Sequence, residues 1–325
     1  MLATAFTELV GCRVPIQQAP MGGATTPELA AAVSRAGGLG MLEHPSPIPL
    51  ADRIAELEQA KGVPFGVNFL MPFLDRSNLS DVELAARRGR LVEFFFDTPD
   101  PSLVGLVHAG GALAGWQVGS VAEAKQAVDA GCDLIIAQGL EAGGHVRGAV
   151  GLLPLLADVL EVVTVPVLAA GGIASARSMA AVLAAGAAGV RVGTRFVATQ
   201  ESGAHPDYVA ALLAAPAEAA VLTDAFSVGW ADATHRVLRS AVAAAQALPD
   251  EVVGVWQSWS GSQPILRWFA WPPSREMTGH VEAMAMYAGQ SVGQVTQAVP
   301  AAQVVTELVE GAERLLRRWE RGLSA

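Results

Sequence analysis

The sequence is poor in cysteine and in charge. Of its 325 residues only two are cysteines, Cys12 and Cys132, and 16% are charged. Two isolated cysteines exclude a disulfide framework and a CxxC zinc or redox site. The first residues, MLATAFTELVGCRV, lack a basic segment followed by an apolar stretch and a cleavage site, so no secretory signal is evident. Together these absences predict a cytoplasmic chain.

Positive charge is scarce as well. The chain has 21 Lys and Arg residues and 31 Asp and Glu residues, which gives a net charge of −10, and it contains no run of basic residues. Nucleic acid is therefore not expected as a partner. The sequence has no HExxH motif, no carboxylates paired with histidines at ligand spacing and no Walker A motif, so no metal site is predicted. The one GxSxG match, 289–293, is followed by no histidine or aspartate, so it does not indicate a hydrolase.

A membrane span is not expected either. The most apolar stretch, 152–174, carries Asp158 and Glu161 in its first half and Pro166 and two glycines in its second. This pattern predicts a buried helix followed by a buried strand.

Apolar residues and glycine are abundant. Apolar residues make up 52% of the chain, and 34 residues are glycine. This composition indicates one sizeable core. Eight short apolar runs alternate with longer stretches of helical period. The predicted strands are 14–20, 38–43, 64–70, 91–97, 112–119, 133–139, 166–172 and 189–195. The predicted crossover helices are 27–36, 50–60, 121–130, 152–162 and 175–185, with a weaker one at 102–109.

Eight such units predict an α/β fold, a (β/α)8 TIM barrel. Near-continuous apolar strands, as in 134–137, indicate a parallel sheet covered by helices on both faces. A doubly wound open sheet is the alternative, but the turn 19–23 lacks the GxGxxG fingerprint.

The chain divides into three predicted parts. Residues 1–212 form the barrel, and 213–277 form an appended, mostly helical cap that holds five of the seven tryptophans. Residues 278–325 form a C-terminal helical segment that returns to the barrel. Within it, 301–321 places Val304, Val305, Leu308, Leu315 and Trp319 at helical spacing. That apolar face packs on the barrel or, alternatively, forms a contact in a homodimer.

Glycines gather where the predicted strands end. They follow strands 1, 6 and 7 and lie within strand 8, and Gly171, Gly172, Gly193 and Thr194 together are expected to direct backbone N–H groups at one phosphate. The alternative is that glycine only permits tight turns. His145 follows strand 6 among glycines and is the candidate acid or base. Arg147, two residues on, is interpreted as a solvated loop residue, with added positive charge at the site as the alternative. His44 falls on the catalytic side without supporting neighbours, and the other four histidines are interpreted as non-catalytic.

Several motifs taken together resemble the nitronate monooxygenases, formerly called 2-nitropropane dioxygenases. They are Pro15-Ile16-Gln17-Gln18-Ala19-Pro20-Met21, Phe65-Gly66-Val67-Asn68, Ala137-Gln138-Gly139, Glu141-Ala142-Gly143-Gly144-His145, Ala169-Ala170-Gly171-Gly172-Ile173, Val192-Gly193-Thr194-Arg195-Phe196 and Tyr287-Ala288-Gly289-Gln290. The resemblance extends to the flavin-containing enoyl-acyl-carrier-protein reductases, which share the Glu-Ala-Gly-Gly-His stretch.

The resemblance implies that FMN lies across the barrel mouth. Its phosphate would contact Gly171, Gly172, Gly193 and Thr194, its ring would lie near Ala19, Pro20, Met21, Asn68 and Gln138, and Gly143 would approach the ring or the ribityl chain. His145 matches the family's catalytic histidine. The tryptophan-rich stretch would cover the flavin or simply form the core of the cap.

The implied reaction oxidises an alkyl nitronate or nitroalkane with O2 to a carbonyl compound and nitrite. Two alternatives remain: an enoyl-acyl-carrier-protein reductase-like enzyme that uses NAD(P)H, and a flavin-free barrel that binds a phosphate ligand. The sequence departs from at least one class of the family at the end of strand 5, where it has Trp116-Gln117 and that class has a histidine, which leaves the substrate open.

Overall fold

Eight parallel strands form the centre of the molecule. The computed structural model describes residues 2–258 and 261–320. The strands are β1 (Ile16–Gln18), β2 (Gly40–His44), β3 (Phe65–Leu70), β4 (Leu91–Phe95), β5 (Leu113–Val118), β6 (Leu134–Gln138), β8 (Val167–Ala170) and β9 (Gly189–Val192), in the order β1-β9-β8-β6-β5-β4-β3-β2. The sheet closes because Gln18 N–H donates to the Leu39 carbonyl at 2.9 Å and Leu39 N–H to that of Ile16 at 2.8 Å. The predicted TIM barrel is thereby confirmed, with all eight strands within the predicted runs or one residue beyond them.

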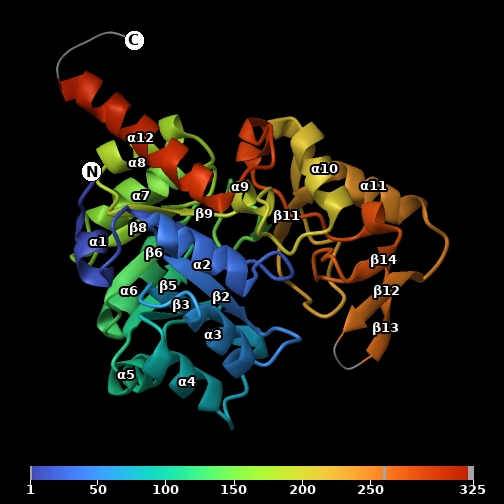
Figure 1. Cartoon of the computed structure of the whole chain (residues 1–325), viewed down its shortest axis with the longest axis horizontal. Coiled ribbons are helices and arrows are strands. Elements are labelled where there is room, and N and C mark those ends of the chain that lie inside the picture. Colours follow the sequence, from blue (N-terminus) through green and yellow to red (C-terminus); the bar gives the residue numbers. More distant parts are fainter. Residues whose placement is uncertain (1, 259–260, 321–325) are drawn as a thin grey trace.

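Helices between the strands cover the barrel (Figure 1). They are α2 (Pro27–Ala36), α3 (Leu50–Glu58), α4 (Ser80–Arg88), α5 (Pro101–Gly110), α6 (Val121–Asp129), α7 (Leu152–Leu160), α8 (Ala176–Ala184) and the one-turn α9 (Thr194–Val197). Side-chain caps start several of them: the hydroxyls of Thr26, Ser120 and Ser175 accept from backbone N–H groups in the first turn. Helix α4 is not among the predicted helices, and α1 (Ala5–Val10) precedes the barrel.

The C-terminal helix α12 (Ala301–Glu320) takes the place of an eighth barrel helix. Because α9 has a single turn, the β9–β1 seam has no crossover helix of its own. Helix α12 packs against α8 and α2, which flank that seam, with Val304, Val305 and Leu308 buried (Figure 1). Trp319, expected on the apolar face, is instead 81% exposed, because it lies beyond the part of α12 that reaches the barrel.

Alternating side chains of the strands build two cores. In β4, Val92 and Phe94 join the cluster between sheet and helices, whereas Leu91 belongs to an apolar layer inside the barrel that contains Phe6 of α1. Glu93 shares the inward face with Leu91 and Phe95. The barrel interior is therefore apolar at the α1 end and polar in the middle.

The cap corrects one expectation, since it is not mostly helical. Among the described residues, α10 (Pro206–Ala214) leads into the cap, which then contains one α-helix, α11 (Arg239–Ala247), and the strands β10 (Ala220–Thr223), β11 (His235–Leu238), β12 (Val252–Ser258) and β13 (Gly261–Leu266), with β14 (Met277–Gly279) at its end. Strands β12, β13 and β14 form one antiparallel sheet. The β-branched and aromatic residues of β12, VVGVWQS, favour an extended chain over a helix. Trp259 lies outside the described residues.

A second small sheet joins the cap to the barrel. Strand β7 (Gly144–His145), in the loop after β6, pairs with β11, which pairs with β10. The described part of the chain also contains four 3-10 turns: η1 (Met71–Phe73), η2 (Ala217–Ala219), η3 (Val281–Ala283) and η4 (Gln290–Gln294). None of the described helices is long and apolar enough to cross a membrane. The division of the chain at residues 212 and 277 stays a prediction.

Candidate active site

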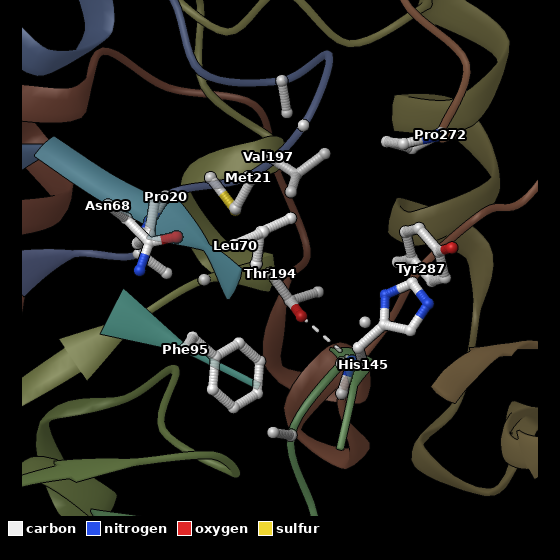
Figure 2. Close-up of a pocket in the computed structure, with 18 of the residues that line it drawn as sticks. Pro20, Met21, Asn68, Leu70, Phe95, His145, Thr194, Val197, Pro272 and Tyr287 are labelled. Carbon is white, nitrogen blue, oxygen red and sulfur yellow. Dashed lines mark hydrogen bonds between the residues drawn. The ribbon is translucent and has the colours of Figure 1, made fainter. Parts of the chain in front are cut away.

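A cavity of about 340 Å3 lies between the carboxyl ends of the barrel strands and the cap. The parallel barrel brings every βα loop to this mouth. All the site residues expected from the sequence line the cavity: Ala19, Pro20, Met21, Asn68, Gln138, Gly143, His145, Gly171, Gly172, Gly193 and Thr194. Figure 2 shows His145 and Tyr287 together on one side, with Asn68, Pro20 and Phe95 across from them.

The glycines at the mouth of the barrel differ in whether backbone conformation or close packing requires a glycine there. Gly171 and Gly172 have φ values of +101° and +69°, which side chains rarely adopt. A Cβ on Gly143 would collide with the backbone of Ala288 and Gly289, so this glycine allows two chain segments to pack. Tight turns and close packing are therefore sufficient reasons for glycine at positions 171, 172 and 143. A Cβ on Gly193 would meet no described atom closer than Ala19 Cβ at 3.5 Å, so Gly193 is not required by packing.

His145 has an aromatic and largely buried surrounding. Its ring stacks on Trp230 at a centroid distance of 3.7 Å, and His235 and Tyr287 lie at 5.2 and 5.4 Å. The backbone is fixed because β7 pairs His145 with His235 of β11. His145 Nε2 is buried and has no hydrogen-bond partner among the described residues. An unpaired buried nitrogen beside a cavity is available to a ligand.

The same surroundings keep the imidazole neutral. Burial, and secondarily the nearby His235, lowers the pKa of His145 to about 3. His235 is neutral as well, because its Nδ1 donates to the Ala233 carbonyl at 2.8 Å and its Nε2 accepts from Phe226 N–H at 3.2 Å. Burial also lowers the pKa of His235. At neutral pH, His145 is thus a neutral imidazole, with a nitrogen lone pair that can accept a proton, rather than a cation.

The loop that carries His145 is held by side chains around it. Gln138 Nε2 donates to the His145 carbonyl at 3.0 Å, and Gln138 Oε1 accepts from Arg147 N–H at 3.4 Å. Both Glu141 carboxylate oxygens accept from Leu152 N–H, at 3.0 and 2.9 Å, at the start of α7. Although Gln138 lines the cavity, its amide nitrogen and its amide oxygen both form hydrogen bonds with the loop.

Arg147 and Trp116 do not face the cavity. The Arg147 guanidinium pairs with Glu123 and lies 5.7 Å from the centroid of the Phe96 ring. Trp116 is fully buried, and its Nε1 donates to the Asp97 carbonyl at 3.0 Å. Its neighbour Gln117 lines the cavity instead.

The floor of the cavity is polar. Arg191 of β9 pairs with Glu93 of β4, and Asn68 Nδ2 donates to Glu93 Oε1 at 3.1 Å. Among the described residues that line the cavity, Arg191 is the one Lys or Arg, and its charge is paired. The sequence signal for this pair is a charged residue of each sign within an otherwise apolar strand, LVEFF and GVRV.

The walls on the cap side are aromatic. Trp230 contacts Phe73 and Phe96 at centroid distances of 5.1 and 4.9 Å, and Trp271 stacks over Gly22 and Gly23. Trp271 Nε1 is buried without a partner among the described residues. Only the richness of 213–277 in tryptophan pointed to these side chains; their individual contacts depend on the cap fold. No group of three metal-ligating side chains occurs in the described part of the chain.

Comparison with known proteins gives the site a family context. The model of the family described as nitronate monooxygenase matches residues 3–87 and 78–311. A curated relative, the (3aS,4S,5R,7aS)-5-hydroxy-7a-methyl-1-oxo-octahydro-1H-indene-4-carboxyl-CoA dehydrogenase of Rhodococcus jostii (strain RHA1), is 40% identical over 207 residues. That match covers 62% of this chain and 57% of the relative, so it spans less than two thirds of the relative's length.

Two solved structures match nearly the whole chain. FabK from Thermotoga maritima has a TM-score of 0.79 and 28% identity, and the match covers 99% of this chain and 100% of that one. The nitroalkane oxidase from Streptomyces ansochromogenes has a TM-score of 0.71 and 31% identity, with 96% and 100% covered.

Proposed function

The chain belongs to the nitronate monooxygenase family, and from that premise we propose that it is a flavin-dependent enzyme that oxidises a nitroalkane or its nitronate. Molecular oxygen is the oxidant, and the products are a carbonyl compound and nitrite. The observation that carries the proposal is the neutral, unpartnered imidazole of His145 beside a cavity lined by the strand-end glycines.

The cavity suits a flavin in two respects. A Cβ on Gly193 would meet Ala19 and Met21 only at ordinary contact distances of 3.5 and 3.8 Å, so packing leaves room at this glycine, and Gly171, Gly172 and Thr194 lie along the same mouth. Asn68 and Gln117 bring amide groups to the floor, where a heterocycle needs hydrogen-bond partners. The flavin that we propose is FMN, with its phosphate held by those four residues and its ring near Ala19, Pro20, Met21 and Asn68. When bound, it supplies the redox chemistry.

His145 then acts as the base. A neutral imidazole accepts the acidic α-proton of a nitroalkane at Nε2, the atom that has no partner within the protein. Trp230 covers the ring and keeps water from it, which preserves its neutrality. Because the cavity holds no unpaired Lys or Arg among its described residues, the neutral nitroalkane suits it better than the anionic nitronate.

Anaerobic mixing tests the reaction class. The yellow protein is mixed with a nitroalkane, with its nitronate, or with NAD(P)H, while the flavin absorbance is followed. Bleaching by the nitro compound but not by NAD(P)H is expected. Bleaching by NAD(P)H alone would favour the second candidate, an enoyl-acyl-carrier-protein reductase-like enzyme, for which the shared Glu-Ala-Gly-Gly-His stretch at 141–145 is the support. A colourless protein that binds no FMN would refute both and favour a flavin-free barrel.

Substitution of the base tests the role of His145. His145→Gln should retain FMN and lose turnover of a nitroalkane by ~100-fold or more, the usual contribution of a positioned base. The loss should be smaller with a preformed nitronate, which has no α-proton to give up. His108→Gln is the control, because His108 pairs with Asp133 away from the cavity. Unchanged turnover in His145→Gln would remove this residue from the mechanism.

A further inference from the structure

A buried ion pair crosses the barrel beneath the cavity. Glu93 of β4 and Arg191 of β9 are 0% and 4% exposed, and their strands lie four places apart in the closed ring of eight, on opposite sides. The Arg191 guanidinium bonds the Glu93 carboxylate directly. Gln17 bridges them, since its Oε1 accepts from Arg191 Nε at 2.9 Å and its Nε2 donates to Glu93 Oε2 at 3.0 Å.

This pair fixes the orientation of two amides at the cavity floor. Asn68 Nδ2 donates to Glu93 Oε1 at 3.1 Å, so the carboxylate takes the nitrogen end of that amide. Gln117 Oε1 accepts from Arg191, so the guanidinium takes the oxygen end of the other. A carboxylate only accepts and a guanidinium only donates, so neither amide can turn over without losing its bond.

The free ends of the two amides are therefore opposite in kind. Asn68 Oδ1 and Gln117 Nε2 have no partner among the described residues, and both residues line the cavity. Figure 2 shows the Asn68 oxygen on the side toward the cavity and its nitrogen turned away. The floor thus presents one acceptor and one donor, from the strands on either side of β4.

We propose that Glu93 and Arg191 are positioning residues that set the polarity of an acceptor–donor pair, Asn68 Oδ1 and Gln117 Nε2, for the edge of the flavin ring. This rests on the proposed function. A flavin edge carries both N–H and carbonyl groups, so a floor of fixed and mixed polarity matches it. The assignment adds Gln117 to the binding residues and gives the ion pair a role beyond stability.

A second buried ion pair provides a matched control. Glu43 and Arg53 lie 2.8 Å apart and are 7% and 3% exposed. Arg53 bonds backbone carbonyls, at 2.7 Å to Glu43 and 3.4 Å to Thr25, rather than an amide that lines the cavity. The same substitution in this pair removes a buried carboxylate of the barrel without altering the floor.

The experiment compares Glu93→Gln with Glu43→Gln. The dissociation constant of FMN is measured by fluorescence titration after reversible removal of the flavin, and the midpoint potential is measured on the holoprotein. Glu93→Gln offers Asn68 an N–H in place of an acceptor, so we expect the dissociation constant to rise about tenfold, the effect of one lost hydrogen bond, and the potential to shift. Glu43→Gln should leave both unchanged, although it too lowers the unfolding midpoint.

Gln117→Glu tests the donor without dismantling the ion pair. It keeps an oxygen for Arg191 and replaces the free Nε2 by oxygen, so it should weaken FMN binding and lower the midpoint potential by adding negative charge at the ring. If Glu93→Gln fails to fold, Gln117→Glu still tests whether the acceptor–donor pair binds the flavin. Wild-type binding and potential in Gln117→Glu would overturn the proposal while leaving the proposed function standing. A wild-type protein that binds no flavin would refute the proposed function itself, and this assignment with it.

Discussion

The protonation of a single residue, His145, links the site to the stability of the fold. Its pKa is about 3 in the folded protein and 6.5 when unperturbed. Between these values the unfolded state binds a proton that the folded state does not, so stability is complete above pH 6.5 and falls as the pH drops toward 3. The site therefore makes the protein acid-sensitive.

That linkage predicts the effect of removing the imidazole. Flavin-free wild type should lose ~1.4 kcal/mol of unfolding free energy per pH unit below 6.5 through this residue, or ~2 kcal/mol by pH 5, and His145→Gln should lack this loss. Urea unfolding at pH 7 and pH 5 measures the difference between the two proteins. Equal losses in both would mean that His145 titrates normally in the folded state.

Trp230 should control the same pKa from the cap. Its ring stacks on His145, so Trp230→Leu admits water and moves the pKa of His145 up toward 6.5. The acid limb of kcat/KM for a nitroalkane should then move from below pH 5 toward neutral pH. Trp256→Leu is the control, since Trp256 stacks on Trp271, 5.9 Å between centroids, rather than on His145. An unmoved acid limb would show that burial by Trp230 does not set the pKa.

At the scale of elements, the loop from β6 to α7 is held on three sides. Glu141 fixes it to α7, β7 fixes it to β11, and Gly143 packs against the 288–289 backbone. Gly143→Ala places a methyl group into that backbone, so it should displace the loop and cost ~1–3 kcal/mol of unfolding free energy. Turnover should fall more than FMN binding.

Gly110→Ala is the control, because this glycine, like Gly143, has no positive φ and no room for a methyl group. A Cβ there would collide with Ala86 Cβ of α4, and the position lies at the end of α5, away from the cavity. It should lower stability without changing the ratio of turnover to FMN binding. If Gly143→Ala behaves in the same way, the packing of residues 143 and 288–289 does not position His145.

The sequence predicted more of the barrel than of the site's contacts. Every barrel strand was identifiable because burial on both faces makes these strands largely apolar, and the barrel then brings Asn68, His145 and Gly193 to one mouth. The stack of Trp230 on His145 joins positions 85 residues apart through a loop of the cap, which no periodicity encodes. Strands β12 and β13 were missed because the tryptophans of 213–277 indicate a cap without indicating its secondary structure, although the valines of β12 do favour an extended chain.

At the scale of the whole molecule, α12 completes the ring of helices around the barrel. Since it bridges α2 and α8 over the β9–β1 seam, the last 20 helical residues stabilise contacts between the first and last strands. Leu308, 3% exposed, should cost ~2–5 kcal/mol when replaced by alanine. Trp319→Ala on the same helix should cost less than ~0.5 kcal/mol, because that ring is exposed. Urea unfolding measures both, and hydrogen exchange in Leu308→Ala should accelerate first in β1 and β9. Uniform acceleration over all strands would show that α12 supports the barrel generally rather than its seam.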